Sequence, residues 1–260
     1  MEVIIVKDSQ ETGIKAADAI EELLNKKPEA VLGIATGSSP LPIYDELAKR
    51  VKAGKVSFKD AKAFSLDEYV GLPKGHPEGY NEVIRKEFTE RLDIDPKNVH
   101  GPDGEAKDIP AACEEYEDAI KAAGGIDLQI LGIGSDGHIG FNEPGSSLAS
   151  RTRLKSLTEQ TREDNARFFN SIDEVPYHVI TQGLGTIMEA KHIVMVVSGE
   201  NKAEAIHRFV EGPVSANCPA SILQMHPHVT VLVDEDAASK LELGDYYRHT
   251  YSHKPQWQGF

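Results

Sequence analysis

Short apolar segments alternate with amphipathic segments along most of this chain, and this alternation limits the possible folds more than any other feature. The apolar segments are short and rich in branched side chains, which is typical of buried parallel strands. We expect strands at 3–6, 30–35, 61–66, 126–133, 192–197 and 229–233. The amphipathic segments predict helices at 14–24, 43–51, 78–91, 110–122, 159–169, 202–210 and 235–241. The alternation therefore predicts an α/β fold, a mostly parallel sheet with helices on both faces.

The length and organisation of the chain favour one domain. Its 260 residues suit a single large α/β domain, and no repeat, low-complexity tract or linker divides them. We expect this domain to span residues 1–245. Residues 246–260 are aromatic, basic and aperiodic, and we expect a carboxyl-terminal tail that either packs on a neighbouring molecule or stays loose.

The charge and the cysteines exclude several classes of protein. The 42 acidic and 28 basic residues give a net charge of −14, which argues against nucleic-acid and membrane partners and makes any anion site depend on local basic groups. Cys113 and Cys218 are far apart and form no CxxC motif, so neither a disulfide framework nor a zinc knuckle is indicated. The amino terminus has no signal-peptide pattern, and no apolar run is as long as a membrane span. We expect a cytoplasmic protein.

A glycine-rich segment after the strand at 126–133 carries the main candidate site. Its sequence, LGIGSDGHIGFNEPGSS, brings Asp136, His138 and Glu143 close together. Parallel α/β sheets bind ligands at the carboxyl ends of their strands, and histidine changes charge near neutral pH. Proton transfer is the leading hypothesis for this segment.

This segment has three other interpretations. GIGSDG at 132–137 matches the dinucleotide fingerprint, but Pro144 and the small residues after it predict no helix, and the two carboxylates would repel phosphates. A metal site is weakly supported, because no second histidine or cysteine lies nearby. His138 as a structural residue capping a turn stays open, but it leaves the carboxylates unexplained. We therefore expect no metal and no redox cofactor.

Two further strand ends carry polar residues. The turn after the strand at 30–35 contains Thr36, Gly37, Ser38 and Ser39, whose hydroxyl and backbone N–H groups suit a phosphate. An ordinary serine N-cap of the next helix is an equally good interpretation. Asp67, at the end of the strand at 61–66, is either another N-cap or a general base held over a carbon acid.

Several stretches of this chain closely resemble the glucosamine-6-phosphate deaminase family. They are ATGSSPLPIY, LDEYVGLP, HPEGYNE and GIGSDGHIGFNEPGSSLASRTRLKSLTEQTREDNARFF, and the resemblance runs from about residue 3 to residue 241. It implies a Rossmann-like three-layer α/β/α sandwich. It also implies the hydrolytic deamination and isomerisation of glucosamine 6-phosphate to fructose 6-phosphate and ammonia, without a metal or redox cofactor.

The resemblance assigns roles to individual residues. Asp67 matches the base that moves a proton between C1 and C2, and His138 matches the acid/base that opens the sugar ring, oriented by Asp136 and Glu143. The phosphate-binding residues it implies are Thr36, Gly37, Ser38, Ser39, Arg167 and Lys202.

Regulation and assembly are also implied by the resemblance. Ser146, Arg153 and Lys155 match positions that bind an allosteric sugar phosphate, N-acetylglucosamine 6-phosphate, in some members. The basic residues of 151–155 would share one face of a strand, as an anion patch or a solvated edge. Some members are hexamers and others are monomers, so a homo-oligomer stays open.

Two alternatives remain beside the deaminase. 6-Phosphogluconolactonase resembles the DGH segment, but Glu143 and Asp67 favour the deaminase. A non-catalytic sugar-phosphate sensor would share the fold and leave the acidic residues without a role.

Overall fold

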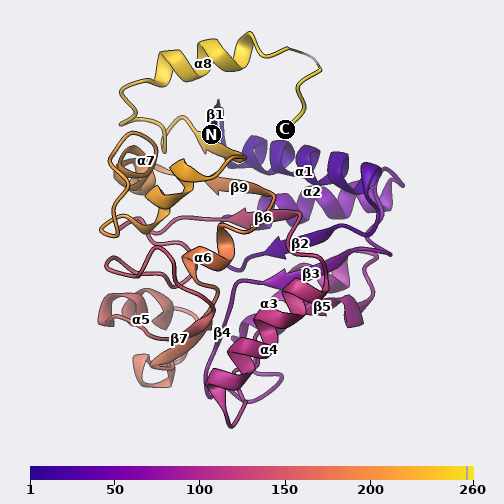
Figure 1. Cartoon of the computed structure of the whole chain (residues 1–260), viewed down its shortest axis with the longest axis vertical. Coiled ribbons are helices and arrows are strands. Elements are labelled where there is room, and N and C mark those ends of the chain that lie inside the picture. The colour runs from indigo at the N-terminus through magenta and orange to yellow at the C-terminus, as the bar shows by residue number, and fades with distance from the viewer. Residues whose placement is uncertain (256) are drawn as a thin grey trace.

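A large parallel sheet forms the centre of the molecule (Figure 1). The computed structural model describes residues 1–255 and 257–260, with Asp164 described by its backbone alone. Within them the large sheet has seven strands in the order β1-β10-β9-β6-β2-β3-β5, and every neighbouring pair is parallel. The strands are β1 (Glu2–Val6), β2 (Val31–Ile34), β3 (Lys62–Ser65), β5 (Val99–His100), β6 (Leu128–Leu131), β9 (His192–Val197) and β10 (Val229–Asp234). The predicted mostly parallel sheet is confirmed.

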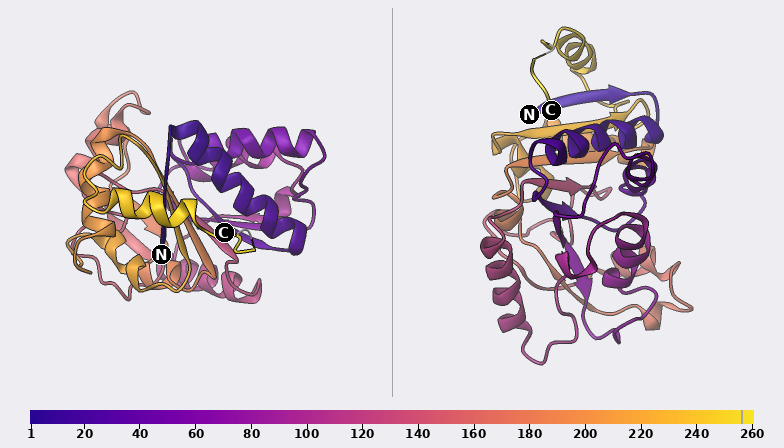
Figure 2. Two further views of the ribbon diagram at one scale, coloured as in Figure 1. Left: turned by 90° about the horizontal axis from the view of Figure 1, so that it is seen from above. Right: turned by 90° about the vertical axis from the view of Figure 1, so that its right-hand side faces the viewer.

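Helices cover both faces of this sheet, as predicted (Figure 2). On one face the core includes side chains of α1 (Ser9–Lys26), α2 (Leu41–Lys52) and α3 (Tyr80–Glu87). On the other face lie α4 (Ile109–Ala122), α6 (Leu184–Ile187) and α7 (Ala203–Val210). In α1 the buried side chains of Ala16, Ile20 and Leu24 recur every four residues and form a stripe against the strands. The result is a three-layer α/β/α sandwich.

A second, antiparallel sheet was not predicted from the sequence. This small sheet has the order β4-β8-β7 and consists of β4 (Asp67–Tyr69), β8 (His178–Thr181) and β7 (Arg153–Ser156). Helix α5 (Glu159–Ala166) follows β7 in the chain and lies beside the small sheet in Figure 1. Because β4 begins two residues after β3 ends, the small sheet starts at the carboxyl edge of the large one.

Two predictions for the carboxyl-terminal part are corrected. Residues 235–241 form turns, with separate hydrogen bonds from Ala238 N to Asp234 O and from Ser239 N to Asp236 O. A seven-residue amphipathic pattern spans only two turns and is a weak helix signal. The helix instead comes later, as α8 (Gly244–Ser252), in the segment that was expected to be aperiodic. It packs on β1 of its own chain (Figure 1); Gln256 of the predicted tail lies outside the described residues.

The remaining elements are short. Helix α3 ends at Glu87, and the 3-10 turn η1 (Thr89–Arg91) completes the predicted segment 78–91. The other 3-10 turns are η2 (Pro96–Asn98), η3 (Ile172–Glu174), η4 (Glu200–Lys202) and η5 (Pro219–Met225). No helix among the described residues has both the length and the apolar character needed to cross a bilayer.

The strand order defines a switch point at one edge of the large sheet. Strands β2 and β6 are neighbours, but the chain continues from β2 toward β3 and from β6 toward β9. In parallel α/β sheets a ligand binds at such a switch point, outside the carboxyl ends of the strands. The two loops at this position are residues 35–40 and 132–145, both of which the sequence marked as candidates.

Candidate active site

The loops after β2 and β6 lie in contact at the switch point. A Cβ atom added to Gly132 would lie 3.3 Å from Cβ and Oγ of Ser39. The two loops are therefore packed together at the switch point, so a ligand bound to one loop would lie close to the other.

The turn after β2 leaves its polar groups available. Tyr44 of α2 fixes the start of the turn, since its hydroxyl donates to Ala35 O (2.7 Å) and accepts from Ala35 N (3.2 Å). Helix α2 begins with Pro40 at the N-cap and has no side-chain cap, so the serine N-cap interpretation is wrong. Within the described chain, the hydroxyls of Thr36, Ser38 and Ser39 and the backbone N–H groups of residues 37–39 make no hydrogen bond. Together they form a set of donors open to an anion.

The loop after β6 folds back on itself around His138. Gly134 N donates to His138 O (2.8 Å), and Gly137 N donates to Gly134 O (3.0 Å) in a turn where Gly137 has a φ of 93°. A Cβ on Gly134 would lie 2.2 Å from Cε1 of His138, so only glycine leaves room for the imidazole. Residues 132–145 contain no helix, which confirms that GIGSDG does not open a dinucleotide-binding helix.

Asp136, His138 and Glu143 are brought together as predicted. Nδ1 of His138 lies 2.7 Å from Asp136 Oδ1 and 3.5 Å from Glu143 Oε2. Burial opposes a charge on the imidazole, but the two carboxylates outweigh it and raise the pKa of His138 to about 9. Burial of Asp136 is likewise outweighed by the neighbouring His138, which holds the pKa of Asp136 well below its usual range. With this pKa, the imidazole favours its charged form at neutral pH.

Asp67 lies beside this cluster, from another element. It is the first residue of β4, so the N-cap interpretation is wrong. Its side chain is buried, and its Oδ2 lies 3.8 Å from the position of a Cβ on Gly140. Burial, together with the nearby Glu68, raises the pKa of Asp67 to about 8, although His138 acts in the opposite direction. A carboxyl group that titrates near neutral pH is suited to both take up and release a proton.

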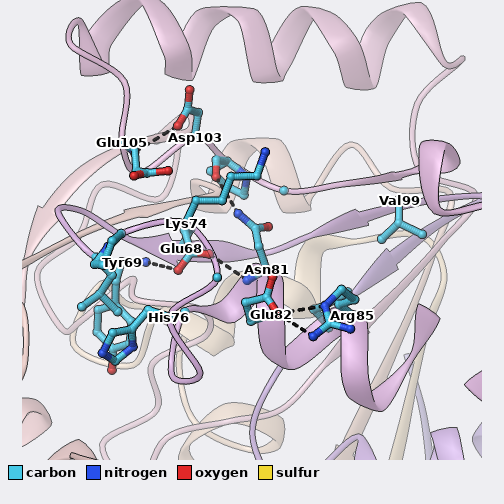
Figure 3. A pocket seen from close by; sticks show the side chains of 18 of the residues that line it. Glu68, Tyr69, Lys74, His76, Asn81, Glu82, Arg85, Val99, Asp103 and Glu105 are labelled. Carbon is cyan, nitrogen blue, oxygen red and sulfur yellow. Dashed lines mark hydrogen bonds and ion pairs between the residues drawn. The ribbon is translucent and has the colours of Figure 1, made fainter. Parts of the chain in front are cut away.

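Glu68 faces the opposite side of β4 and has a structural role. Its carboxylate accepts hydrogen bonds from the backbone N atoms of Tyr69 (2.7 Å), Tyr80 (2.8 Å) and Asn81 (2.7 Å). It thus satisfies the amino end of α3. Figure 3 shows it in a separate cavity of about 530 Å³, which also contains Lys74 and the Glu82–Arg85 ion pair. None of the residues assigned to catalysis lines this cavity.

The cluster also has a geometry that a metal ion could use. One potential ligand atom each from Asp136, His138 and Glu143 lies within 4.8 Å of the others. The same proximity is what an acid/base relay requires, so distance alone does not separate the two uses.

The two predicted phosphate cations come from separate elements. Lys202 ends η4, directly after β9, which neighbours β6; its backbone is therefore at the same carboxyl edge as both loops. Arg167 is the exposed C-cap of α5, and its guanidinium carbon lies 4.7 Å from the centre of the Phe168 ring. In the described structure Arg167 makes no hydrogen bond with residues 36–39.

The three predicted effector residues occupy different surroundings. Arg153 is half-buried on β7 and donates to Asn142 Oδ1 (2.9 Å), and no carboxylate of a described residue pairs with it. Burial lowers the pKa of Arg153. Lys155 follows two residues later on the same face of β7. Ser146 is buried in the loop, and its Oγ has no hydrogen-bond partner among the described residues.

Three residues that support the site were not found from the sequence. Thr161 of α5 donates to Glu143 Oε1 (2.8 Å), Thr181 of β8 accepts from Phe141 N (3.1 Å), and the amide of Asn142 donates to Gln182 O (2.8 Å). Each contact joins segments 18 to 40 residues apart. No local pattern carries that information.

The parallel α/β fold thus places a cluster of two carboxylates and an imidazole next to a donor-rich turn. Residues 8–232 match the family described as glucosamine-6-phosphate isomerases/6-phosphogluconolactonase, and the chain belongs to this family.

Similar proteins within this family cover the whole chain. Glucosamine-6-phosphate deaminases of Arthrobacter sp. and Mycolicibacterium smegmatis are 69% and 64% identical to it, over 100% of both chains in each case. The structure of a monomeric glucosamine-6-phosphate deaminase matches with a TM-score of 0.90 and 42% identity, covering 92% of this chain and 100% of that one. The 6-phosphogluconolactonase from Trypanosoma cruzi shares the fold with a TM-score of 0.74, at 18% identity over 93% of this chain and 97% of its own.

Proposed function

We propose that this protein is an enzyme that converts glucosamine 6-phosphate and water to fructose 6-phosphate and ammonia. The observation that carries the proposal is the His138 imidazole held between two carboxylates, with the buried Asp67 beside it. The identity to named deaminases over the full chain favours this reaction over lactone hydrolysis. A sensor without catalysis would have no use for a carboxyl group whose pKa is raised by burial.

In the proposed reaction, His138 opens the sugar ring. As a cation it can donate a proton to the ring oxygen, and as the neutral imidazole it can take the proton of the anomeric hydroxyl. Asp136 and Glu143 hold the His138 imidazole in place and stabilise its charged form. The net result is the open-chain aldehyde, with no change in the number of protons.

Asp67 then moves a proton between neighbouring carbons. It removes the proton on C2 while a proton from His138 moves to the oxygen on C1, which gives an enolamine. Asp67 then returns its proton to C1, which leaves a protonated imine at C2. Water adds to this imine, and ammonia leaves. Its carboxyl group suits both proton transfers because burial brings its pKa near neutral.

The phosphate would bind in the turn after β2. The open hydroxyls of Thr36, Ser38 and Ser39 and the N–H groups beginning with Gly37 supply donors, and Lys202 and Arg167 supply positive charge. An acidic protein must concentrate such charges locally.

The direct test is to mix the purified protein with glucosamine 6-phosphate and to measure ammonia and fructose 6-phosphate. We expect both in equal amounts, with solvent deuterium in the product, and very little turnover of unphosphorylated glucosamine. Hydrolysis of 6-phosphogluconolactone without release of ammonia would establish the lactonase instead.

The proposed reaction uses no metal or redox cofactor. We therefore expect activity to survive dialysis against EDTA. A loss that one divalent metal specifically restores would assign Asp136, His138 and Glu143 as metal ligands.

We also propose that an anionic effector binds near Ser146, Arg153 and Lys155. The support is a half-buried arginine without a carboxylate partner among the described residues. Addition of N-acetylglucosamine 6-phosphate should lower the KM, and sedimentation should show whether the protein is a homo-oligomer or, like the relative of known structure, a monomer. We also propose that the enzyme is cytoplasmic, since its substrate is a small sugar phosphate. We expect no nucleic-acid or membrane partner.

A further inference from the structure

We propose that Thr161 is a positioning residue that fixes the Glu143 carboxylate against His138. This inference rests on the proposed function and adds a residue to it. The two oxygens of Glu143 make different contacts, because Oε1 accepts from the Thr161 hydroxyl at 2.8 Å while Oε2 lies 3.5 Å from His138 Nδ1. The hydroxyl thereby determines which oxygen faces the imidazole.

The Thr161 hydroxyl is itself held in one orientation. Thr158 is the N-cap of α5, and its Oγ1 accepts from Thr161 N at 3.1 Å. The two threonine Oγ1 atoms lie 2.9 Å apart. An ionised carboxylate can only accept, so Thr161 donates to Glu143 and has a lone pair left for the hydroxyl of Thr158. The first turn of α5 thus presents one oriented donor to the active-site loop.

The other groups that act on the Glu143 carboxylate belong to its own loop. Its side chain is buried, and the hydroxyl of Thr161 donates to its Oε1 from a different element. The charged and titratable groups near it are His138 and Asp136 of the same loop, with Asp67 of β4 next to His138. If the hydroxyl were missing, the carboxylate could rotate away from the imidazole, and the proton would be held less tightly.

The same helix also reaches the other parts of the proposed site. One turn after Thr161, Asn165 Nδ2 donates to the Tyr69 hydroxyl at 2.9 Å, on the strand that begins with Asp67. Arg167 follows at the C-cap. The position of α5 therefore links the ring-opening group at its amino end to the phosphate cation at its carboxyl end.

The test compares Thr161→Val with Thr161→Ser and Thr158→Ala. Valine keeps the shape and removes the donor, and a hydrogen bond to a charged group is large enough that we expect kcat to fall about tenfold or more, with KM nearly unchanged. Serine should restore most of the loss. Thr158→Ala removes the N-cap and one contact that orients the Thr161 hydroxyl, but it keeps the donor to Glu143. It should therefore lower thermal stability and reduce kcat less than Thr161→Val does.

A second readout does not depend on turnover. The pKa of the His138 imidazole, followed by NMR, should be lower in Thr161→Val than in the wild type, because a nearby carboxylate favours the charged ring. If Thr161→Val does not fold, Thr161→Ala replaces it in both measurements.

The outcomes separate the two proposals. Wild-type kcat and wild-type titration of His138 in Thr161→Val would overturn the positioning role, as would a loss in Thr161→Ser equal to that in Thr161→Val. An inactive wild type would overturn the proposed reaction, while the His138 titration would still decide the role of Thr161.

Discussion

The loops after β2 and β6 lie side by side but are built in opposite ways. In the turn after β2, the hydroxyls and the N–H groups of residues 37–39 have no partners within the described chain. The loop after β6 satisfies several of its own groups, with bonds from Gly134 N to His138 O, from Ser146 N to Glu143 O, and from His138 N to Asp136 Oδ1. The turn after β2 therefore offers donors to a ligand, whereas the loop after β6 is held in shape by its own hydrogen bonds.

This difference matches two different tasks. Binding an anion requires donors that are free until the anion is present. Proton transfer requires groups whose positions and protonation are set in advance, so that little reorganisation is needed during the reaction. Changes in the first loop should therefore act on KM, and changes around the second should act on kcat.

The largest expected effect comes from Asp67→Asn. The amide keeps the size of the side chain but cannot act as a base, and general-base catalysis contributes about a hundredfold to ten-thousandfold. We expect kcat to fall by this factor while KM changes little. Glu68→Gln is the matched control, since Glu68 faces away from the loop and bonds the amino end of α3. Its charge acts on Asp67 only by raising its pKa, so this variant should lose stability and change kcat much less than Asp67→Asn. Equal losses of kcat in both variants would remove Asp67 from the mechanism.

Lys202→Ala should act on binding. A charge-assisted bond to phosphate contributes about 1.5–3 kcal/mol, so KM should rise at least about tenfold, with a smaller change in kcat. Lys191→Ala removes the same charge from the opposite end of β9, where Lys191 pairs with Asp127 at 2.7 Å, and should leave KM unchanged. If Lys202→Ala lowered kcat and left KM unchanged, the assignment of Lys202 to phosphate binding would be wrong.

Alanine at one glycine of each loop sharpens the comparison. In Gly134→Ala the new Cβ would lie 2.2 Å from His138 Cε1, so the ring must move and kcat should fall about tenfold. In Gly37→Ala no atom lies within 4 Å of the new Cβ, but the φ of 90° is strained for alanine by about 1 kcal/mol or more. We expect this variant to raise KM a few fold. Steady-state kinetics of the two variants checks both expectations.

The smallest effect concerns stability. The pKa of Asp67 is raised to about 8 in the folded protein, so between about pH 4 and pH 8 the folded state binds this proton more tightly than the unfolded state. Unfolding in this range therefore releases the Asp67 proton, and the contribution of Asp67 to stability falls as the pH rises. Asp67→Asn removes the penalty and should raise the free energy of unfolding at pH 8–9 by roughly 1 kcal/mol or more. Urea unfolding at pH 5 and pH 9 measures it; an equal effect at both pH values would contradict the assignment.

The sequence predicts the large sheet well, and the small sheet poorly, for a physical reason. Strands such as β9 are buried on both faces, so their branched residues form a continuous apolar run. Strand β4 is DEY and strand β7 is RLKS, both polar and short, and they exist because they pair with β8 at long range. Helix α8 was missed because the contacts that hold it are long-range: it packs on β1, and Lys254 after it forms an ion pair with Glu2 at 2.7 Å.

The site follows the same rule. Asp136, His138 and Glu143 lie within one loop, so their proximity could be predicted from spacing. The roles of Asp67 and Lys202 came from the resemblance to a family, and only the order of the parallel strands explains why they share an edge. Thr161 could not be predicted, because its contact depends on how α5 returns to the loop.

Helix α8 has one more consequence, for the solubility of the protein. The two outer strands of the large sheet are β5, which is only two residues long, and β1, which is covered by α8. An uncovered outer strand offers its free backbone groups to other chains and promotes aggregation. A chain that ends before Gly244 would keep every residue of the active site, yet it would expose β1 to pairing with other copies. The last turns of the chain thus protect the whole sheet while taking no part in its chemistry.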